Sequence, residues 1–423
     1  MSNSFSKEEI VAFEDILEKF NDQLVLSKLV KKYNMPDVQA ERANNTIWRP
    51  MPYIAQSHDG TDATANFDDA TQLSVPSTLG YQKHSTAVLS ATELRDQMQE
   101  GRLGEAAAEK LASDINLAVT AVICNQSTLV VKRTVAATGF DDVALANTIM
   151  NEQGIQSLGR KLALNSRDYA GMASNLGART LDNSKSLTAY EESFIGRVSK
   201  FDTYLLDYST RLLAAAGVTV TINGSNQYYT PVAMTTAATG ETSLKDNRYQ
   251  NIVLGVSSGT VRVGDAFTIA GVNAVHHITK QDTGQLKTFR IIAQVSGATG
   301  GAGTYTISPP IISGQGGTDA ELAYQNVTAT PATTAVVTFL NTAATQVNPF
   351  WLDKSIELLP GRYAIPMEAG AAVKTGMTDN GIELTMQKFY DINTMKTKYR
   401  WDTFFGVVNL QPEMSGIILF NQV

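Results

Sequence analysis

The sequence is poor in the residue types that carry most enzyme chemistry. Its 423 residues include four histidines and one cysteine, Cys124. A single cysteine cannot form an intramolecular disulfide, so we expect a protein of a reducing compartment. His276 and His277 are adjacent in a strand-like segment, where successive side chains point to opposite faces, so their rings cannot share one metal ion. The sequence therefore predicts no catalytic, metal or cofactor site.

Charge is also sparse, and it is not clustered. Charged residues make up 18% of the chain, the formal net charge is -7, and the basic residues form no run longer than a pair such as Lys31-Lys32. Tight binding to nucleic acid requires clustered cations that displace counterions from phosphate groups. If the protein handles DNA, this composition predicts that it encloses DNA without binding it specifically.

Long apolar runs are absent as well. No stretch reaches the roughly 18 apolar residues of a membrane-spanning helix. The first ten residues, MSNSFSKEEI, lack a basic region followed by an apolar core. We therefore expect neither a membrane span nor a secretory signal peptide. The glycine-rich segment 297–303 lacks the ending and the spacing of phosphate-binding loops and lies between two strand-like segments, so it predicts a hairpin turn.

What is present begins with an amphipathic helix. The length of the chain and its 43% content of hydrophobic residues predict two or three folded units. In residues 6–31, Ser6 and Glu9 have the spacing of a capping box, and apolar residues follow on one stripe. The stripe comprises Ile10, Phe13, Leu17, Phe20 and Leu24. Two interpretations remain open: a helix that docks on its own domain, and an arm that lies on a neighbouring chain.

A second helix is predicted from Ser90 to about Asn125. Ser90 and Glu93 again suit a capping box, and a buried stripe follows. Gly101 and Gly104 interrupt the first part of this helix, and each costs about 1 kcal/mol relative to alanine. We therefore expect a break near these glycines, with one short helix before it and a long one after it.

The segment between the two helices, residues 50–86, is rich in Asp, Ser, Thr and Gly and has three prolines. Loops of this length are uncommon in compact domains unless they are functional or disordered, so the segment predicts an extended, projecting hairpin. Its carboxylates are either solvated loop charges or contacts between subunits. The candidates for such contacts are Asp62, Asp68 and Asp69.

Strand patterns dominate the rest of the chain. Residues 128–215 alternate strand-like and helix-like pieces, which is a mixed α+β pattern. From 218 to 342, short β-branched runs separated by Gly, Asn and Asp predict a closed barrel or a sandwich. The segments on either side of this block lack a self-contained core pattern. We therefore interpret it as a β domain inserted into a host fold.

One loop of this block, residues 235–249, carries an unusual concentration of charge. Glu241, Lys245, Asp246 and Arg248 form a cluster of opposite signs in an otherwise sparsely charged chain. Such a cluster is either solvated or joins neighbouring subunits through charge pairs.

Short motifs along nearly the whole chain resemble a known family, the coat proteins of the short-tailed phages related to the Salmonella type. They occur in the order that this family has. The motifs are RANNTIW (42–48), LRD (94–96), KLA (110–112), LNSRDY (164–169), VSKFDTYL (198–205), DNR (246–248), FW (350–351), FG (405–406) and QPE (411–413) with Gly416.

The resemblance implies an α+β fold, the tailed-phage major capsid fold of the Hong Kong 97 type, with an inserted all-β barrel domain. It implies the following division: N-terminal arm, 1–45; P-domain strand and extended E-loop, 46–86; spine helix of the P-domain, 87–127; first part of the A-domain, 128–217; inserted I-domain, 218–342; completion of the A- and P-domains, 343–423.

The implied function is that of a major capsid protein, not an enzyme. Its copies would form hexamers and pentamers that build an icosahedral procapsid with a scaffolding protein and a portal in the host bacterial cytoplasm. The shell would then expand and enclose double-stranded DNA in the virion, without a membrane or a cofactor. In the family, acidic positions of the arm are implicated in scaffold contact, and Glu14 and Asp15 match them best.

Two other classes stay open at this point. A bacterial nanocompartment shell of the encapsulin type shares the fold, but the resemblance gives it no inserted barrel like the block at 218–342. The other class is an extracellular β-rich adhesin or a hydrolase. The absence of a signal peptide motif and the poverty in catalytic residue types oppose this second class.

Overall fold

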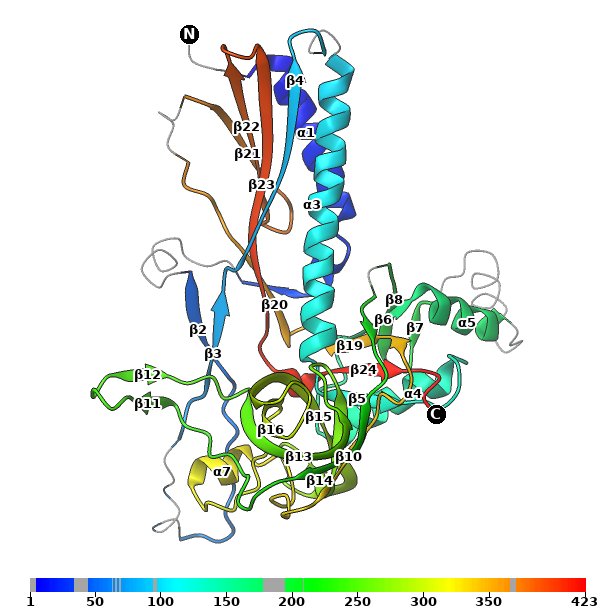
Figure 1. The fold of residues 1–423 in the computed structure, drawn as a ribbon, viewed down its shortest axis with the longest axis vertical. Helices are drawn as coiled ribbons and strands as arrows, with labels where there is room; N and C mark the ends of the chain where they lie inside the picture. Colours follow the sequence, from blue (N-terminus) through cyan, green and yellow to red (C-terminus); the bar gives the residue numbers. More distant parts are fainter. Residues whose placement is uncertain are drawn as a thin grey trace. The chain divides into compact units, whose positions relative to one another are not determined.

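The chain folds into two compact units. The computed structural model describes residues 5–33, 45–62, 64, 67, 70–93, 97–177, 195–207, 209–365 and 370–423. The first unit consists of Met1–Ile47, Ser77–Ala121 and Ile356–Val408, and the second of Trp48–Pro76, Val122–Ser355 and Asn409–Val423. Both units combine helices with sheets (Figure 1), as the α+β class predicted.

The first unit is built on a six-stranded sheet. Its order is β1-β20-β23-β22-β21, and β4 also pairs with β23. The strands are β1 (Lys31–Lys32), β4 (Tyr81–Ser90), β20 (Ile356–Pro360), β21 (Ala372–Met377), β22 (Glu383–Asp391) and β23 (Lys396–Asn409). Tyr399 and Trp401 on β23 are buried and stack with ring centroids 6.0 Å apart, so they anchor the core of this unit.

Helix α1 (Lys7–Gln23) starts with the predicted capping box, in which the Ser6 side chain accepts from the Glu9 backbone and the Glu9 carboxylate accepts from the Ser6 backbone. The helix ends earlier than the predicted residue 31. A short 3-10 helix, η1 (Leu26–Leu29), follows it. Leu24, Leu26 and Val30 are all buried, and a single α-helical stripe cannot point all three inward.

The apolar stripe of α1 packs inside its own unit. Phe13 and Phe20 are buried, at 1% and 0% exposure. Phe13 and Leu17 lie so close to Gly376 of β21 that a Cβ there would come within 2.9 Å of each. The interpretation as a helix docked on its own domain is therefore confirmed. The alternative, an arm whose apolar stripe lies on a neighbouring chain, is wrong, because the stripe has its partner within the chain.

Helix α3 (Gln97–Gln126) runs without interruption through both glycines. The predicted break near Gly101 and Gly104 is therefore wrong. A Cβ at Gly104 would come within 2.3 Å of Ile16 Cδ1, so this glycine permits the close approach of α1. The predicted stripe of Leu111, Ile115, Ala118 and Val122 is buried, and this packing outweighs the weak helix propensity of two glycines.

The capping box predicted at Ser90 also differs in its role. The Ser90 backbone amide donates to Glu93 Oε2 at 2.8 Å, and the Glu93 amide donates to Ser90 Oγ at 3.4 Å. However, Ser90 is the last residue of β4, and α3 is described only from Gln97 onward. The reciprocal pair therefore closes the turn that follows a strand.

The second unit contains a closed β-barrel, as the pattern of the block at 218–342 predicted. The strands close in the order β10-β13-β16-β15-β14-β17. They are β10 (Ala216–Ile222), β13 (Gln250–Thr260), β14 (Ala266–Val275), β15 (Asp282–Gly297), β16 (Gly303–Ser308) and β17 (Val336–Phe339). Phe267 and Phe289 stack inside it with centroids 5.6 Å apart. The GATGGAG segment connects β15 to β16, so the predicted hairpin turn is confirmed.

The chain enters and leaves the barrel side by side. β9 (Arg211–Leu212) and β18 (Thr345–Gln346) pair with each other, Leu212 opposite Thr345. An insertion needs neighbouring entry and exit points because its host must close around it. The β9–β18 pair is therefore the junction of an inserted barrel.

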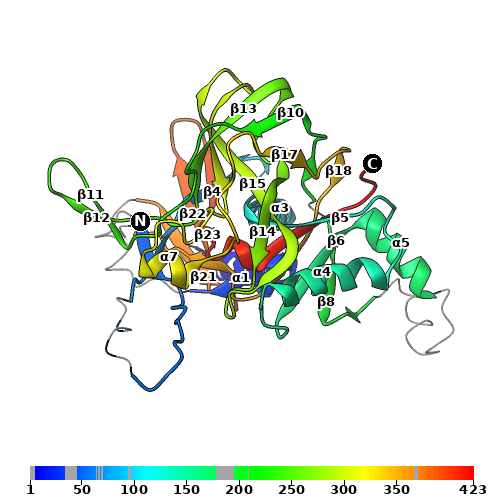
Figure 2. The same ribbon diagram turned by 90° about the horizontal axis from the view of Figure 1, so that it is seen from below.

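The host part of the second unit is a six-stranded sheet with two helices. Its order is β5-β24-β19-β6-β8-β7. The strands are β5 (Leu129–Lys132), β6 (Arg160–Asn165), β7 (Arg197–Val198), β8 (Phe201–Leu206), β19 (Asn348–Leu352) and β24 (Ser415–Leu419). Helices α4 (Phe140–Glu152) and α5 (Ser166–Gly177) lie beside these strands (Figure 2). Both helices contribute buried residues to the same core as the strands.

The segment predicted as an extended hairpin, residues 50–86, is divided between two sheets. β2 (Thr46–Pro50) and β3 (Ser74–Thr78) pair in a two-stranded sheet, with a long loop between them. Residues from 81 onward belong instead to β4 and pair with β23. The hairpin prediction is thus confirmed only up to residue 78.

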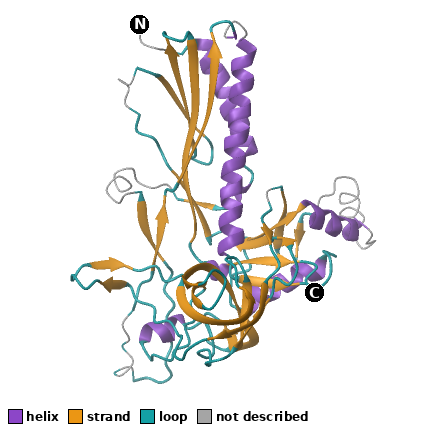
Figure 3. Ribbon diagram, viewed as in Figure 1, coloured by secondary structure: helices purple, strands orange, loops and turns teal. Residues whose placement is uncertain are grey.

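Figure 3 shows that strands make up most of the regular structure, together with few helices. Of the helices in the ranges that the structure describes, none is both long enough and apolar enough to span a bilayer.

Alanine substitutions at the two glycines of α3 should change the free energy of unfolding in opposite directions. A Cβ at Gly101 meets no heavy atom within 4 Å, whereas one at Gly104 meets Ile16. We expect Gly101→Ala to raise the free energy of unfolding by up to about 1 kcal/mol through helix propensity. Gly104→Ala should lower it by about 1 kcal/mol, because overpacking outweighs the same gain. Urea unfolding followed by tryptophan fluorescence measures both.

The double variant Gly104→Ala with Ile16→Val separates the two effects, because it removes the Cδ1 atom in conflict. It should recover most of the stability lost in Gly104→Ala. Equal destabilisation by both glycine substitutions would contradict the close-packing explanation.

Candidate functional site

The predicted charged loop forms a hairpin that extends away from the barrel (Figures 1 and 2). Its strands β11 (Met234–Thr236) and β12 (Thr242–Leu244) pair with each other antiparallel, and no further described strand pairs with either. Residues 234–243 are all exposed, and Gly240 turns the tip with a φ of 87°. Glu241 lies beside this glycine. An exposed two-stranded ribbon offers its backbone and side chains to another chain.

The base of this hairpin is fixed by Asp246 and Arg248. The Arg248 guanidinium binds the Asp246 carboxylate, with NH2 to Oδ2 at 2.7 Å and Nε to Oδ1 at 2.9 Å. Its NH1 group donates to the Asn409 carbonyl at 2.7 Å. Only 8% of Arg248 is exposed. Burial lowers the pKa of Arg248, but the hydrogen bonds to Asp246, together with the charge interactions with Tyr249 and Asp246, outweigh burial and leave that pKa raised.

Asn247 extends the same anchor. Its Oδ1 accepts from the Tyr229 hydroxyl at 2.9 Å and from the Val232 amide at 3.1 Å. Its Nδ2 donates to the carbonyls of Val232 and Lys245. Lys245 lies with its Nζ 4.8 Å from the centroid of the Tyr229 ring. Of the four predicted charges, Asp246 and Arg248 therefore pair within the chain, whereas Glu241 is exposed on the hairpin.

The other predicted contact residues lie on separate elements. Glu14 and Asp15 are exposed on α1, on the side away from its buried stripe. Asp62 is exposed and accepts hydrogen bonds from the Thr64 side chain and backbone, which lower its pKa. Asp68 and Asp69 lie outside the described residues. Glu14 and Asp15 therefore belong to the first unit, whereas Asp62 and the charged hairpin belong to the second.

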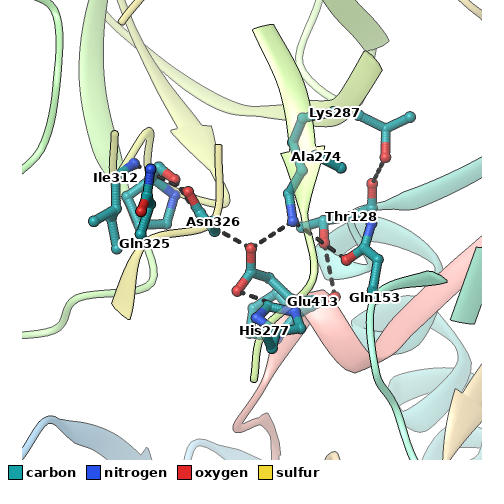
Figure 4. A network of polar contacts seen from close by, with 12 residues as sticks. Thr128, Gln153, Ala274, His277, Lys287, Ile312, Gln325, Asn326 and Glu413 are labelled. Carbon is teal, nitrogen blue, oxygen red and sulfur yellow. Dashed lines mark hydrogen bonds and ion pairs between the residues drawn. The ribbon is translucent and has the colours of Figure 1, made fainter. Parts of the chain in front are cut away.

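A buried polar network that the sequence analysis did not identify lies between the barrel and the host part of the second unit (Figure 4). Lys287 of β15 pairs with Glu413 at 2.8 Å from Nζ to Oε1. Asn326 Nδ2 donates to the same oxygen at 2.9 Å. Lys287 Nζ also donates to Gln153 Oε1 at 3.3 Å. Glu413 belongs to η3 (Pro412–Met414), and Gln153 follows α4.

The surroundings of the Lys287–Glu413 pair shift the pKa of Glu413. The Lys287 side chain is fully buried, and that of Glu413 is 24% exposed. Burial alone raises the pKa of Glu413, but the charges of Lys287 and His277, together with the hydrogen bonds from Lys287 and Asn326, outweigh burial and lower this pKa to about 2. The carboxylate therefore stays ionised at neutral pH. Removal of one partner from such a pair leaves a buried charge without compensation, which is strongly destabilising.

His277 completes the network on the same side. Its Nε2 lies 3.9 Å from Glu413 Oε2, too far for a hydrogen bond. Burial lowers the pKa of His277 to about 4, against the influence of Glu413. The imidazole is therefore neutral at pH 7. The neighbouring His276 has different partners, because its Nδ1 accepts from the backbone amides of Ile278 and Thr279.

Hydrogen bonds to backbone groups also hold the barrel against the host part of the second unit. Thr288 Oγ1 donates to the Thr128 carbonyl at 2.7 Å, and Thr128 Oγ1 donates to the Pro412 carbonyl at 2.9 Å. The His277 amide donates to the Gln153 carbonyl at 3.3 Å. Three elements of the host part thus hold the barrel through both backbone and side chains. The arrangement fixes the barrel in place on the host part. In the described ranges, no group of three or more His, Cys, Asp or Glu residues could hold a metal ion.

The sequence contained one signal for this network. After its first residue, Asp282, β15 carries only two charged residues, Lys287 and Arg290, and both side chains are buried. A cation in a barrel strand needs a partner from elsewhere in the fold. The partner of Lys287, Glu413, is 126 residues away in sequence (413 − 287), so only the structure identifies it.

Comparisons with known proteins found a matching family and several similar solved structures. The family described as "P22 coat protein - gene protein 5" matches residues 1–421. The solved I-domain of the coat protein of CUS-3 is 41% identical, covers 29% of this chain and 96% of its own, and has a TM-score of 0.23. A structure of Mycobacterium phage Che8 is 9% identical, covers 95% of this chain and 92% of its own, with a TM-score of 0.47. The capsid structure of cyanophage P-SCSP1u is 8% identical, with coverages of 93% and 86% and a TM-score of 0.43.

The network predicts how stability depends on pH. The pKa of His277 falls from 6.5 to about 4 on folding. The unfolded chain therefore binds a proton in this window that the folded chain does not, and stability declines as the pH falls from 6.5 towards 4. The contribution of Glu413 is present above pH 4.5 and is lost as the pH falls towards 2, below this window. Between pH 7 and about pH 4.5 we expect His277 to account for a loss of roughly 2–3 kcal/mol.

His277→Asn should therefore flatten the pH dependence, whatever its effect at pH 7. Urea unfolding at the two pH values measures this slope for wild type and variant. His84→Asn, at an exposed histidine of β4, is the control and should keep the slope of the wild type. An unchanged slope in His277→Asn would show that its imidazole is not the group that titrates.

Proposed function

The chain belongs to the P22 coat protein family, and on this premise we propose that it assembles with a scaffolding protein and a portal into an icosahedral procapsid. As a member of this phage major capsid protein family, it is a structural part of the virion and acts as a homo-oligomer. The procapsid forms in the host cytoplasm, expands, and encloses packaged double-stranded DNA. The sparse, unclustered positive charge supports enclosure of DNA without specific binding.

The observation that carries the proposal is the exposed hairpin β11–β12 on a rigid base. A contact element between shell subunits must reach out from its domain and hold its direction. Exposure from 234 to 243 supplies the first property. The Asp246–Arg248 pair and its bond to Asn409 supply the second. We therefore assign the intersubunit contact to Glu241 and Lys245, and to Asp246 and Arg248 the task of holding the hairpin that makes this contact.

The energetics of a shell favour weak contacts of this kind. One exposed ion pair is worth roughly 0.2–1 kcal/mol, so a misplaced subunit can dissociate and be replaced. A two-fold contact makes each pair twice, and the shell repeats it many times. Small losses at one position therefore accumulate in assembly while the single chain stays folded.

The six-part division is proposed on the same premise: arm at 1–45, E-loop region at 46–86, spine helix at 87–127, A-domain from 128, I-domain at 218–342, and completion from 343. Asp62, Asp68 and Asp69 are proposed as E-loop contacts between subunits. The two alternative classes, a nanocompartment shell and an adhesin or hydrolase, are not retained, because the family match covers residues 1–421.

The first test concerns the hairpin. Glu241→Lys should leave the melting temperature of the subunit unchanged, since the side chain is exposed, and should lower the yield of closed shells several-fold. Joint exchange of charge, Glu241→Lys with Lys245→Glu, should partly restore shells. Purified subunits are assembled with scaffolding protein, and closed shells of uniform diameter are counted by negative-stain electron microscopy and sedimentation.

Glu109→Lys, an equal charge reversal at an exposed position of α3, is the matched control and should assemble normally. Normal shell yield from Glu241→Lys at moderate salt would remove the hairpin from the assembly interface. Failure of the wild-type chain to form closed shells would contradict the proposed function itself.

The second test concerns the arm helix. Glu14→Lys or Asp15→Lys should weaken scaffold-dependent assembly at an unchanged melting temperature, because both side chains are exposed. Glu18→Lys, at another exposed position of α1, serves as a control for general charge effects. Phe13→Ala should instead destabilise the subunit by about 3–5 kcal/mol. Scaffold binding by the two acidic variants that equals the wild type would contradict a role of the arm in this contact.

A further inference from the structure

The long loop between β2 and β3 contacts the barrel domain of its own chain. Two stretches of it, residues 51–62 and 70–73, belong to the second unit, as does the short helix α7 (Asp319–Tyr324). Gln56 Nε2 donates to the Asp319 carbonyl at 3.1 Å. The Tyr324 hydroxyl donates to the Thr71 carbonyl at 3.0 Å. Both stretches of the loop are thereby tied to one helix turn (Figure 1).

Tyr324 is the centre of this contact. Its hydroxyl meets the backbone of Ile54 on the first stretch and that of Thr71 on the second. The two stretches are also tied to each other, because the Tyr53 hydroxyl donates to Gln72 Oε1 at 2.7 Å. Burial raises the pKa of Tyr324, as does Tyr53, so its hydroxyl keeps its proton and remains a donor.

The contact between the loop and α7 buries little of the loop's surface. None of the described residues from 51 to 72 is buried, so the loop contributes little apolar area to the unit. A cavity of about 330 Å³ remains between the loop and α7, lined by Tyr53, Ala55, Ala70, Ala323 and Tyr324 among others. This pocket is open to solvent, so the loop does not pack tightly against the helix. The hydrogen bonds of Gln56 and Tyr324 join neutral groups, and each has only a modest net effect on stability.

We propose that this contact is an autoinhibitory latch, in which α7 holds the loop of the free subunit and assembly requires its release. The inference rests on the proposed function, because release matters only if the loop engages another subunit. A subunit with its loop on α7 cannot offer the same backbone to a neighbour. Only subunits with a released loop can bind. The apparent affinity of the subunit for the growing shell is therefore its intrinsic affinity multiplied by the fraction of subunits whose loop is released.

The fraction of subunits whose loop is released sets the rate of assembly. Loss of the Tyr324 hydroxyl removes the bond to Thr71 and the contact with Ile54 together, while the ring keeps its place beside the cavity. Tyr324→Phe should therefore raise the released fraction, and with it the initial rate of assembly, by about fivefold. Light scattering after addition of scaffolding protein measures this rate.

Hydrogen exchange of residues 51–62 in unassembled subunits measures the release directly. We expect faster exchange there in Tyr324→Phe and no change in Tyr390→Phe, which removes the same hydroxyl from a residue of β22. Unchanged exchange in Tyr324→Phe would show that the hydroxyl does not hold the loop. Faster exchange with an unchanged or slower assembly rate would show that the contact does not restrain assembly. Either result overturns the latch.

The converse experiment locks the loop. Ala55 and Ala323 line the same cavity, so the double variant Ala55→Cys with Ala323→Cys can be joined by a short bismaleimide. The native Cys124 is buried, and burial raises its pKa to about 12, so it does not react. Locked subunits should keep the melting temperature of the untreated variant and remain unassembled.

Each single-cysteine variant, treated with the same reagent, carries the modification without the cross-link and should assemble at the wild-type rate. Assembly of the locked subunit at that rate overturns the latch and leaves the proposed function intact. Failure of the untreated wild-type chain to assemble contradicts the proposed function and is distinguishable from either outcome.

Discussion

The pairing of Lys287 with Glu413 is the constraint on which the arrangement of the second unit depends. Lys287 has no access to solvent, so its charge is tolerable only where the carboxylate of Glu413 and the amide oxygen of Gln153 face it. These partners come from the host part of the unit, on either side of the barrel in sequence. The barrel therefore has one position in which its buried cation is compensated, and this position orients everything that the barrel carries.

Two elements with contrasting anchorage depend on that orientation. The hairpin β11–β12 is held at its base by the buried Arg248, which binds both Asp246 and the Asn409 carbonyl. The loop between β2 and β3 is held on α7 through neutral hydrogen bonds of Gln56 and Tyr324. Charge-assisted, buried bonds resist displacement far better than exposed neutral ones. The hairpin therefore suits a fixed contact, whereas the loop suits one that changes.

This division of strong buried and weak exposed interactions agrees with the requirements of a shell. Interfaces that form too tightly trap misplaced subunits, whereas a subunit that deforms cannot present its contacts in the correct geometry. The chain is low in charge overall, and several of its charges are used internally, as at Asp246 and Arg248. Exposed residues such as Glu241 and Glu14 remain for individually weak contacts with other chains.

The sequence by itself determined the elements whose signals are local. The capping box of Ser6 and Glu9, the stripe of α1 and the barrel strands follow from spacing and periodicity, because neighbours in sequence decide them. The partner of a side chain is decided by residues far away in the chain. The tertiary structure alone showed that Gly104 belongs to an unbroken helix against Ile16, that Arg248 faces inward, and that Lys287 meets Glu413. Packing and burial can outweigh local propensity by several kcal/mol, and they exist only once the chain has folded.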